Sequence, residues 1–164
     1  MNYSLVIIDM QVNFPAAQNV KTVTAVIREI NQAKRNNRPI FLVEISPGCM
    51  PCGPSHPEIL AALRGYDNWH RVEKYGSDGT PALTTPQAES IGDGPAISEI
   101  TSCKRIRIVG VNTDCCVQMT ALGLKGSGYN VDVVTDACHS QYDHTWGLAV
   151  MQRFGCRMLR SAYA

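Results

Sequence analysis

Short, continuous apolar segments alternate along the chain with longer segments in which apolar residues recur every three or four positions. The continuous segments predict buried strands, most clearly at residues 3–8, 39–44, 105–111 and 130–135. Two weaker strands are predicted at residues 69–72 and 156–159. Continuous apolar runs of this length are typical of strands that are covered on both faces, as in a parallel sheet.

The amphipathic segments between these strands predict helices. The longest helix is expected at residues 19–37, where Pro39 follows its end. Shorter helices are expected around Ile97 and Ile100, from near Asp114 to residues 126–128, and at residues 146–154. The alternation of strand and helix predicts an α/β fold, a three-layer αβα sandwich. Its sheet should be mostly parallel and Rossmann-like, with about six strands, in a single domain of residues 1–164.

Two segments follow neither pattern. Residues 46–57 are rich in proline and glycine, and residues 76–95 are similarly loop-like. Long loops in a compact domain often bind ligands or cover a site. We therefore expect these two loops to set substrate specificity.

Composition narrows the classes of function. Of the 164 residues, 45% are hydrophobic and 18% are charged, and the formal net charge is +1. The lysines and arginines are scattered, so no nucleic-acid partner is expected. No apolar run approaches the length of a membrane span or a signal-peptide core, which predicts a cytoplasmic protein. The seven cysteines are an odd number without an export signal, which favours reduced thiols over a disulfide framework.

Three reactive side chains lie at or just after predicted strand ends. Asp9 ends the first strand, Lys74 follows the strand at residues 69–72, and Cys116 lies just beyond the strand at residues 105–111. Ligands bind at the carboxyl ends of the strands in an open parallel sheet. We therefore expect these three side chains to meet at one edge.

Cys116 has the strongest chemical case. It lies where a strand turns into a helix, and Thr113 or Asp114 is a suitable helix N-cap. The helix dipole should favour the thiolate and lower the pKa of Cys116, and free backbone N–H groups could bind an oxyanion. The alternative is a small residue that fills the core, because free cysteine is commonly buried.

Asp9 and Lys74 each have a plain structural interpretation as well. Asp9 could be a helix cap or a loop-tethering acid, and Lys74 a solvated surface lysine. If the two lie beside Cys116, desolvation would raise the pKa of Asp9 and suit it to accept a thiol proton. Lys74 would then hold the Asp9 carboxylate in place.

The motifs around these residues resemble those of the isochorismatase-like cysteine hydrolase superfamily, which includes nicotinamidases and N-carbamoylsarcosine amidohydrolase. The run L-V-I-I-D-M-Q-V-N-F ending at Phe14 is similar to the family's strand followed by D-M-Q-x-D-F, with Asn13 in place of the second acid. The segment G-V-N-T-D-C-C-V at residues 110–117 is similar to the nucleophile motif G-V-x-T-D-x-C-V, a register that selects Cys116 and not Cys115. The segment after Lys74 is also similar, although the usual S-x-F aromatic is missing, and D-A-C at residues 136–138 matches.

The resemblance implies a catalytic triad of Asp9, Lys74 and Cys116. It also implies an oxyanion hole from the backbone amides of Asn112 and Cys116, a cis peptide between Val111 and Asn112, and a turn that Thr113 helps to hold. Phe14 and Asn112 would contact the substrate, Phe14 as an apolar wall. The implied chemistry is hydrolysis of a small-molecule amide or ureide through a thioester. Isochorismatases of the same fold cleave an enol ether instead, so that reaction remains an alternative.

Metal and cofactor chemistry is not expected. In the family that this chain resembles, nicotinamidases carry a metal site that begins with D-x-H after the second strand. Here Glu44 and Ser46 occupy the two ligand positions. His56 and His70 remain, and His56 looks more like the start of a surface helix. We therefore predict no metal and no cofactor. Family members usually self-associate, so the resemblance implies a homo-oligomer.

Two further classes of function remain open. The chain could be a non-catalytic small-molecule-binding member of the same fold. Alternatively, Cys49 and Cys52 form a C-x-x-C pair, which can serve as a zinc site or a redox centre. Their position in a Pro/Gly-rich loop, with only His56 nearby, favours two ordinary loop thiols.

Overall fold

The sheet is parallel throughout the described strands. The computed structural model describes residues 2–84 and 103–161. Six strands lie in the order β3-β2-β1-β4-β5-β6, and every neighbouring pair is parallel. They are β1 (Ser4–Ile8), β2 (Ile40–Ile45), β3 (Trp69–Lys74), β4 (Arg105–Val111), β5 (Asn130–His139) and β6 (Arg157–Leu159). The predicted α/β class, the six strands and the parallel sheet are confirmed.

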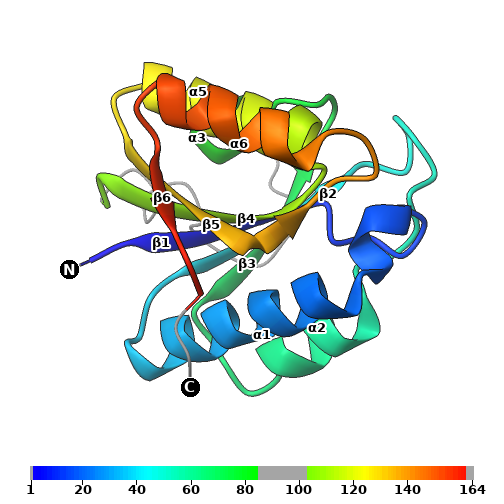
Figure 1. Ribbon diagram of the computed structural model, residues 1–164. Helices are drawn as coiled ribbons and strands as arrows, with labels where there is room; N and C mark the ends of the chain where they lie inside the picture. The colour runs from blue at the N-terminus through cyan, green and yellow to red at the C-terminus, as the bar shows by residue number, and fades with distance from the viewer. Residues whose placement is uncertain (1, 85–102, 162–164) are drawn as a thin grey trace.

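Helices cover both faces of this sheet, which completes the predicted three layers. In Figure 1, α1 (Val20–Arg35) and α2 (Pro57–Leu63) lie on one face, and α3 (Thr80–Thr84), α5 (Gln118–Gly126) and α6 (His144–Arg153) lie on the other. The chain also forms a 3-10 helix, η1 (Pro15–Gln18), and a π-helical turn, η2 (Thr113–Val117). The helix predicted around Ile97 and Ile100 lies outside the described residues.

Burial on both faces explains why the strand sequences are continuously apolar. All five residues of β1 are buried. Leu5 and Ile7 belong to the core cluster beneath α1, whereas Val6 and Ile8 belong to the cluster beneath α5. Successive side chains of a strand point to opposite faces, so each face of this central strand needs apolar residues.

Two strands run further than the apolar pattern predicted. β3 continues through Lys74, and β5 continues to His139, because both extensions keep pairing with a neighbouring strand. The extension of β5 carries Asp136, whose carboxylate accepts hydrogen bonds from the backbone N–H and the hydroxyl of Ser161 at 2.7 and 2.5 Å. The bonds to Ser161 thus allow the polar Asp136 to lie inside β5. A prediction from hydropathy alone ends this strand too early, because it cannot include such a partner.

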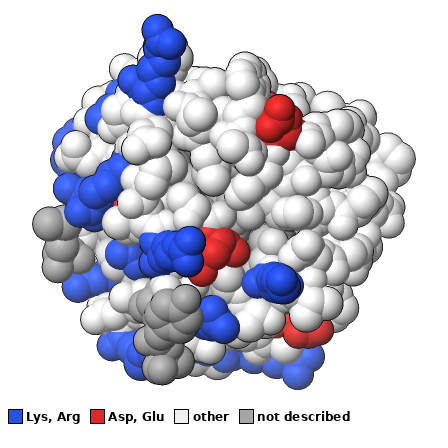
Figure 2. Space-filling view, viewed as in Figure 1, with Lys and Arg blue, Asp and Glu red and all other residues white. Residues whose placement is uncertain are grey.

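Charged side chains compensate each other near the amino ends of the strands. Asp132 of β5 is buried and accepts hydrogen bonds from Arg105 at 2.8 Å and from Arg157 at 2.7 Å. The two arginines thus compensate the buried negative charge and join three neighbouring strands. Figure 2 shows basic side chains mainly over the left and lower parts of one face, scattered acidic ones, and a largely uncharged area toward the right. Among the described residues, none of the helices has the length and apolar character needed to cross a membrane.

Candidate active site

Asp9 lies where the chain leaves the central strand β1. Its backbone has a φ of 50°, and its side chain is 1% exposed. The backbone N–H of Asp9 donates to Val43 O at 3.0 Å, which keeps the residue aligned with β2. The carboxylate is therefore fixed at the carboxyl edge of the sheet and shielded from water.

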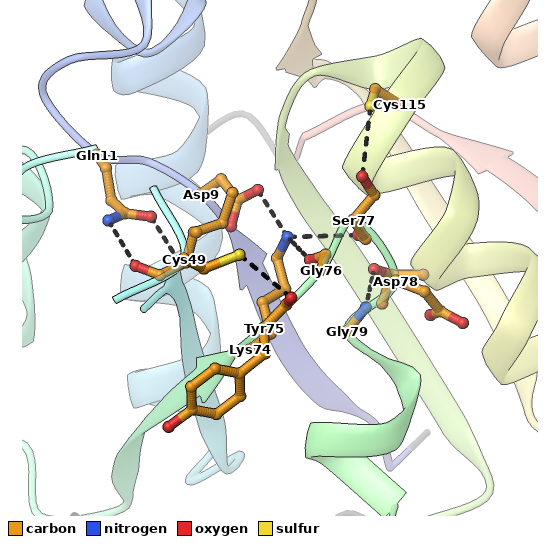
Figure 3. A network of polar contacts seen from close by, with 12 residues as sticks. Asp9, Gln11, Cys49, Lys74, Tyr75, Gly76, Ser77, Asp78, Gly79 and Cys115 are labelled. Atoms are coloured by element: carbon orange, nitrogen blue, oxygen red, sulfur yellow. Dashed lines mark hydrogen bonds and ion pairs between the residues drawn. The ribbon is translucent and has the colours of Figure 1, made fainter. Parts of the chain in front are cut away.

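Lys74 is the last residue of β3, and its side chain is also 1% exposed. Its Nζ lies 3.0 Å from Asp9 Oδ2 and donates to Gly76 O at 2.8 Å and to Ser77 O at 3.3 Å. Figure 3 shows the ammonium group between the carboxylate and these two carbonyls. Three oxygen partners match the three N–H donors of the group. The structure thus excludes the interpretation of Lys74 as a solvated surface residue.

Burial raises the pKa of the Asp9 carboxyl group above its ordinary value of 3.8. The positive charge of Lys74 and interactions with Cys116 lower it, without reversing the effect of desolvation. This direction agrees with the sequence prediction. The arrangement gives a buried base whose negative charge is stabilised by one neighbouring cation.

Cys116 lies in the π-helical turn η2 and is 8% exposed. Burial and, after it, the negative charge of Asp9 raise the pKa of its thiol to about 12, although Lys74 acts in the opposite direction. The sequence prediction of a thiol acidified by a helix N-terminus is wrong. Desolvation and the facing carboxyl group of Asp9 keep the proton on sulfur, so the resting thiol is neutral.

The turn before Cys116 contains the non-proline cis peptide between Val111 and Asn112 that the resemblance implied. Asn112 O accepts from the N–H groups of Cys115 and Val117 at 3.1 and 3.2 Å. The backbone N–H of Asn112 donates to no group within residues 2–84 and 103–161. It is therefore available as one donor of an oxyanion hole.

The helix cap predicted at Thr113 or Asp114 is wrong. Asn112 precedes the turn, and its side chain makes no capping bond. Thr113 and Asp114 lie inside η2, and their side chains bond to the segment that follows β5. The sequence analysis missed this segment because its polar residues have no periodicity and find their partners through tertiary contacts.

Gly147 of α6 packs directly on the backbone of this turn. A Cβ atom at this position would lie 2.8 Å from Asp114 Cα and Asp114 N. Because backbone atoms cannot move aside as a side chain can, Gly147→Ala should shift α6 away and lower the free energy of unfolding by about 1–3 kcal/mol. Chemical denaturation measures the effect. An unchanged midpoint would show that the turn tolerates the extra methyl group.

The segment after β1 fastens the loop that follows β2. Gln11 Nε2 donates to Gly53 O at 2.8 Å, and Gln11 Oε1 accepts from Ile45 N at 2.8 Å. Asn13 Nδ2 donates to Pro51 O at 3.0 Å, which the carboxylate of the family's usual second acid could not do. Phe14 is partly buried and packs against both core clusters, so its role as a substrate wall stays a prediction.

A cavity of about 510 Å³ adjoins Lys74. It is lined by Lys74, Tyr75, Gly76, Ser77, Asp78, Pro81, Ala82 and Met119. Its volume falls within the range of small-molecule pockets. The cavity therefore lies beside Lys74, and its walls come from the segment after β3, from α3 and from Met119 of α5.

The residues at the family's metal position do not fit a metal site. Glu44 Oε1 accepts from Ser55 at 2.6 Å, and Glu44 Oε2 lies 3.4 Å from Arg71 Nε. His56 Nδ1 accepts from the N–H of Glu58 and caps α2, and the ring of His70 stacks on Phe41. The described residues contain no group of three or more His, Cys, Asp or Glu side chains suited to a metal ion. The absence of a metal stays a prediction.

The two thiols of the C-x-x-C pair have different surroundings. Cys49 is exposed and donates to Tyr75 O at 3.2 Å, whereas Cys52 is buried. Burial raises the pKa of the Cys52 thiol, which makes it a poor nucleophile for redox chemistry. Both are free thiols, and a redox role stays a hypothesis.

A family model for the isochorismatase domain matches residues 3–162. The chain belongs to the isochorismatase family. It is 30% identical over 141 residues to isochorismatase domain-containing protein 2 of Xenopus laevis, a match that covers 85% of this chain and 61% of that protein. The isochorismatase chain described here thus spans less than two thirds of that relative's length.

Solved structures share the isochorismatase fold. A MAR1 ribonuclease from Caenorhabditis elegans superimposes with a TM-score of 0.80 at 22% identity, covering 98% of this chain and 77% of that one. The nicotinamidase SaPncA from Staphylococcus aureus superimposes with a TM-score of 0.78 at 20% identity, covering 98% of each chain. The names of these two proteins indicate different substrates, so at this identity the likeness concerns the fold.

Proposed function

We propose that this chain is a cysteine-dependent hydrolase of a small-molecule C–N bond, an amide or ureide, with Asp9, Lys74 and Cys116 as its catalytic triad. One observation carries the proposal. A buried carboxylate faces a buried thiol and is held 3.0 Å from a buried ammonium group. Such charges are costly to bury, so they are typical of a site where their chemistry is used.

In the proposed mechanism, Asp9 accepts the thiol proton as Cys116 Sγ attacks the carbonyl carbon of the substrate. The resting thiol is protonated, so proton transfer and attack are coupled rather than sequential. Lys74 stabilises Asp9 before the transfer and interacts with the thiolate as charge develops on sulfur. Asp9, now protonated, gives its proton to the leaving amine or ammonia. Water then hydrolyses the thioester and restores the thiol.

The negative oxygen of the tetrahedral intermediate would be bound by the backbone N–H groups of Asn112 and Cys116. Preorganised N–H donors at such a position are commonly worth ~10²–10³ in rate. The N–H of Asn112, unpartnered among the described residues, supports this role. Phe14 and the side chain of Asn112 are the proposed substrate contacts. The Asn112 side chain is itself anchored, because its Oδ1 accepts from Gln141 N at 3.1 Å.

The nicotinamidase of the same fold supports the choice of a C–N bond. An amine or ammonia leaving group also needs a proton, which Asp9 holds after it has accepted the thiol proton. The test is a screen of small amides and ureides for ammonia release, with isochorismate as a parallel substrate and Cys116→Ala as the control. Cys116-dependent ammonia release supports the proposal. Turnover of isochorismate alone would instead assign the enol-ether reaction. No turnover combined with an unreactive Cys116 thiol would favour a non-catalytic binding protein.

The pH dependence of the reaction follows from the state of Asp9. Only the ionised carboxylate can accept the thiol proton, so kcat/KM should rise with pH through the raised pKa of Asp9 and then reach a plateau. The ascending limb should lie above the ordinary carboxyl pKa of 3.8. A profile from pH 4 to 9 measures it. A rate that instead climbs tenfold per pH unit up to pH 9 would mean that free thiolate limits the reaction.

We also propose that the chain forms a single catalytic domain and self-associates. Trp146 of α6 and Phe154, which directly follows this helix, are 54% and 62% exposed, so they offer apolar surface that a second copy of the chain could cover. Light scattering of the purified protein tests the oligomeric state. A monomer at tens of micromolar would contradict self-association and leave the catalytic proposal untouched.

A further inference from the structure

We infer that the segment from Ser140 to Gly147 positions the nucleophile turn, and that His144 is its central positioning residue. The inference rests on the proposed function insofar as the turn η2 carries the nucleophile and one oxyanion donor. It adds a residue that neither the nucleophile motif nor the ion pair contains.

Three consecutive side chains, one directly before the turn and two within it, bond to this segment. Asn112 Oδ1 accepts from Gln141 N at 3.1 Å, and Thr113 Oγ1 lies 2.7 Å from His144 Nδ1. The Asp114 carboxylate accepts from the hydroxyl of Ser140 and, at 2.9 Å, from the backbone N–H of Asp143. Each residue between the cis peptide and Cys115 is therefore fixed by a separate bond to one short segment.

The contact between Thr113 and His144 is the least replaceable of these bonds. Thr113 is fully buried, and His144 is partly buried. Burial and the neighbouring His139, whose ring centre lies 6.1 Å away, lower the pKa of His144, whereas Asp114 raises it. A neutral imidazole can accept a hydrogen bond from the Thr113 hydroxyl at Nδ1. The bond thus satisfies a buried hydroxyl that would otherwise lack a partner.

Close packing leaves the turn little freedom to move. Gly147 approaches the backbone of Thr113 and Asp114 so closely that a Cβ would lie 2.8 Å from three of its atoms. The segment holds the turn by side-chain bonds and by this backbone contact. His144 touches neither the thiol nor the carboxylate in the described contacts, so it acts through Thr113.

The experiment is a double-mutant cycle read by kinetics. Thr113→Val and His144→Ala each remove one partner, and the double variant removes both. We expect each single variant to lower kcat roughly 10- to 100-fold with KM nearly unchanged, because a misplaced nucleophile costs rate more than binding. The double variant should be no slower than the slower single variant. His144→Asn, whose side-chain oxygen can take the place of Nδ1, should recover most of kcat. Thr145→Val, on the exposed side of the same helix, is the matched control.

A second readout does not depend on substrate turnover. The rate at which iodoacetamide alkylates Cys116 should fall in Thr113→Val and His144→Ala and recover in His144→Asn. If no substrate is found, this series still tests the positioning role. Loss of thermal stability in the single variants, with kcat and alkylation rate unchanged, would reduce His144 to a structural residue and overturn the inference. Additive losses in the double variant would also overturn it.

Discussion

Replacing Cys116 with alanine is expected to abolish ammonia release from every accepted amide, with a loss of kcat of at least ~10³-fold. The alanine variant keeps the turn η2 and the ion pair between Asp9 and Lys74, so the protein should fold. What it loses is the atom that forms the thioester. Steady-state ammonia release measures the effect, and circular dichroism checks the fold.

Cys115→Ala is the matched control, because it removes the adjacent thiol from the same turn. Cys115 Sγ points toward Ser77 Oγ, 4.0 Å away, and not toward Asp9 (Figure 3). The kcat of the Cys115→Ala variant should stay within about threefold of the unmodified protein, because the substitution removes no group that the proposed reaction uses. Equal loss from both variants with the fold intact would mean that the motif register assigns the wrong cysteine.

Separating Asp9 from Lys74 should be the most destabilising change in the site. Lys74→Met leaves the buried Asp9 carboxylate without its opposite charge, at a cost of about 3–5 kcal/mol in the free energy of unfolding at pH 7. Asp9→Asn should cost less, because its neutral amide resembles the protonated acid that burial favours. The double variant leaves no charge behind, so its loss should be smaller than the sum of the two. Urea unfolding of the four proteins measures the cycle, and additive losses would contradict a direct pair.

The free energy of unfolding of these variants should change with pH in a defined direction. The folded protein holds the Asp9 proton more tightly than the unfolded chain does, because burial raises the pKa. Stability therefore falls as pH rises from the unfolded value near 3.8 through the folded one. Lys74→Met removes the cation that lowers this pKa, so its destabilisation should shrink as pH falls toward 4. Asp9→Asn should show no such relief.

The strand pattern and the motifs were sufficient to predict where the reactive groups meet. Asp9, Lys74 and Cys116 are far apart in sequence, yet each lies at or just beyond a strand end, and parallel strands end at one edge. The family motif distinguished Cys116 from Cys115, which periodicity could not do. The cis peptide at Val111–Asn112 was available from the resemblance alone, since nothing in the local composition indicates it.

The electrostatics of the thiol could not be predicted from the sequence. A cysteine at the start of a helix suggested acidification, but the structure buries the thiol against Asp9, and burial raises its pKa to about 12. Whether a dipole or desolvation dominates depends on neighbours that are distant in sequence. The same limit applies to the contact of His144 with Thr113, which joins residues 31 positions apart.

The measurement that tests the central claim most directly is a search for the acyl-enzyme. The protein is mixed with an accepted amide, quenched in acid within the steady state, digested and analysed by mass spectrometry. We predict an adduct with the mass of the acyl group on the peptide that contains Cys115 and Cys116, retained in Cys115→Ala and absent from Cys116→Ala. Turnover at full rate without such an adduct, or an adduct that survives in Cys116→Ala, would contradict the proposed thioester mechanism.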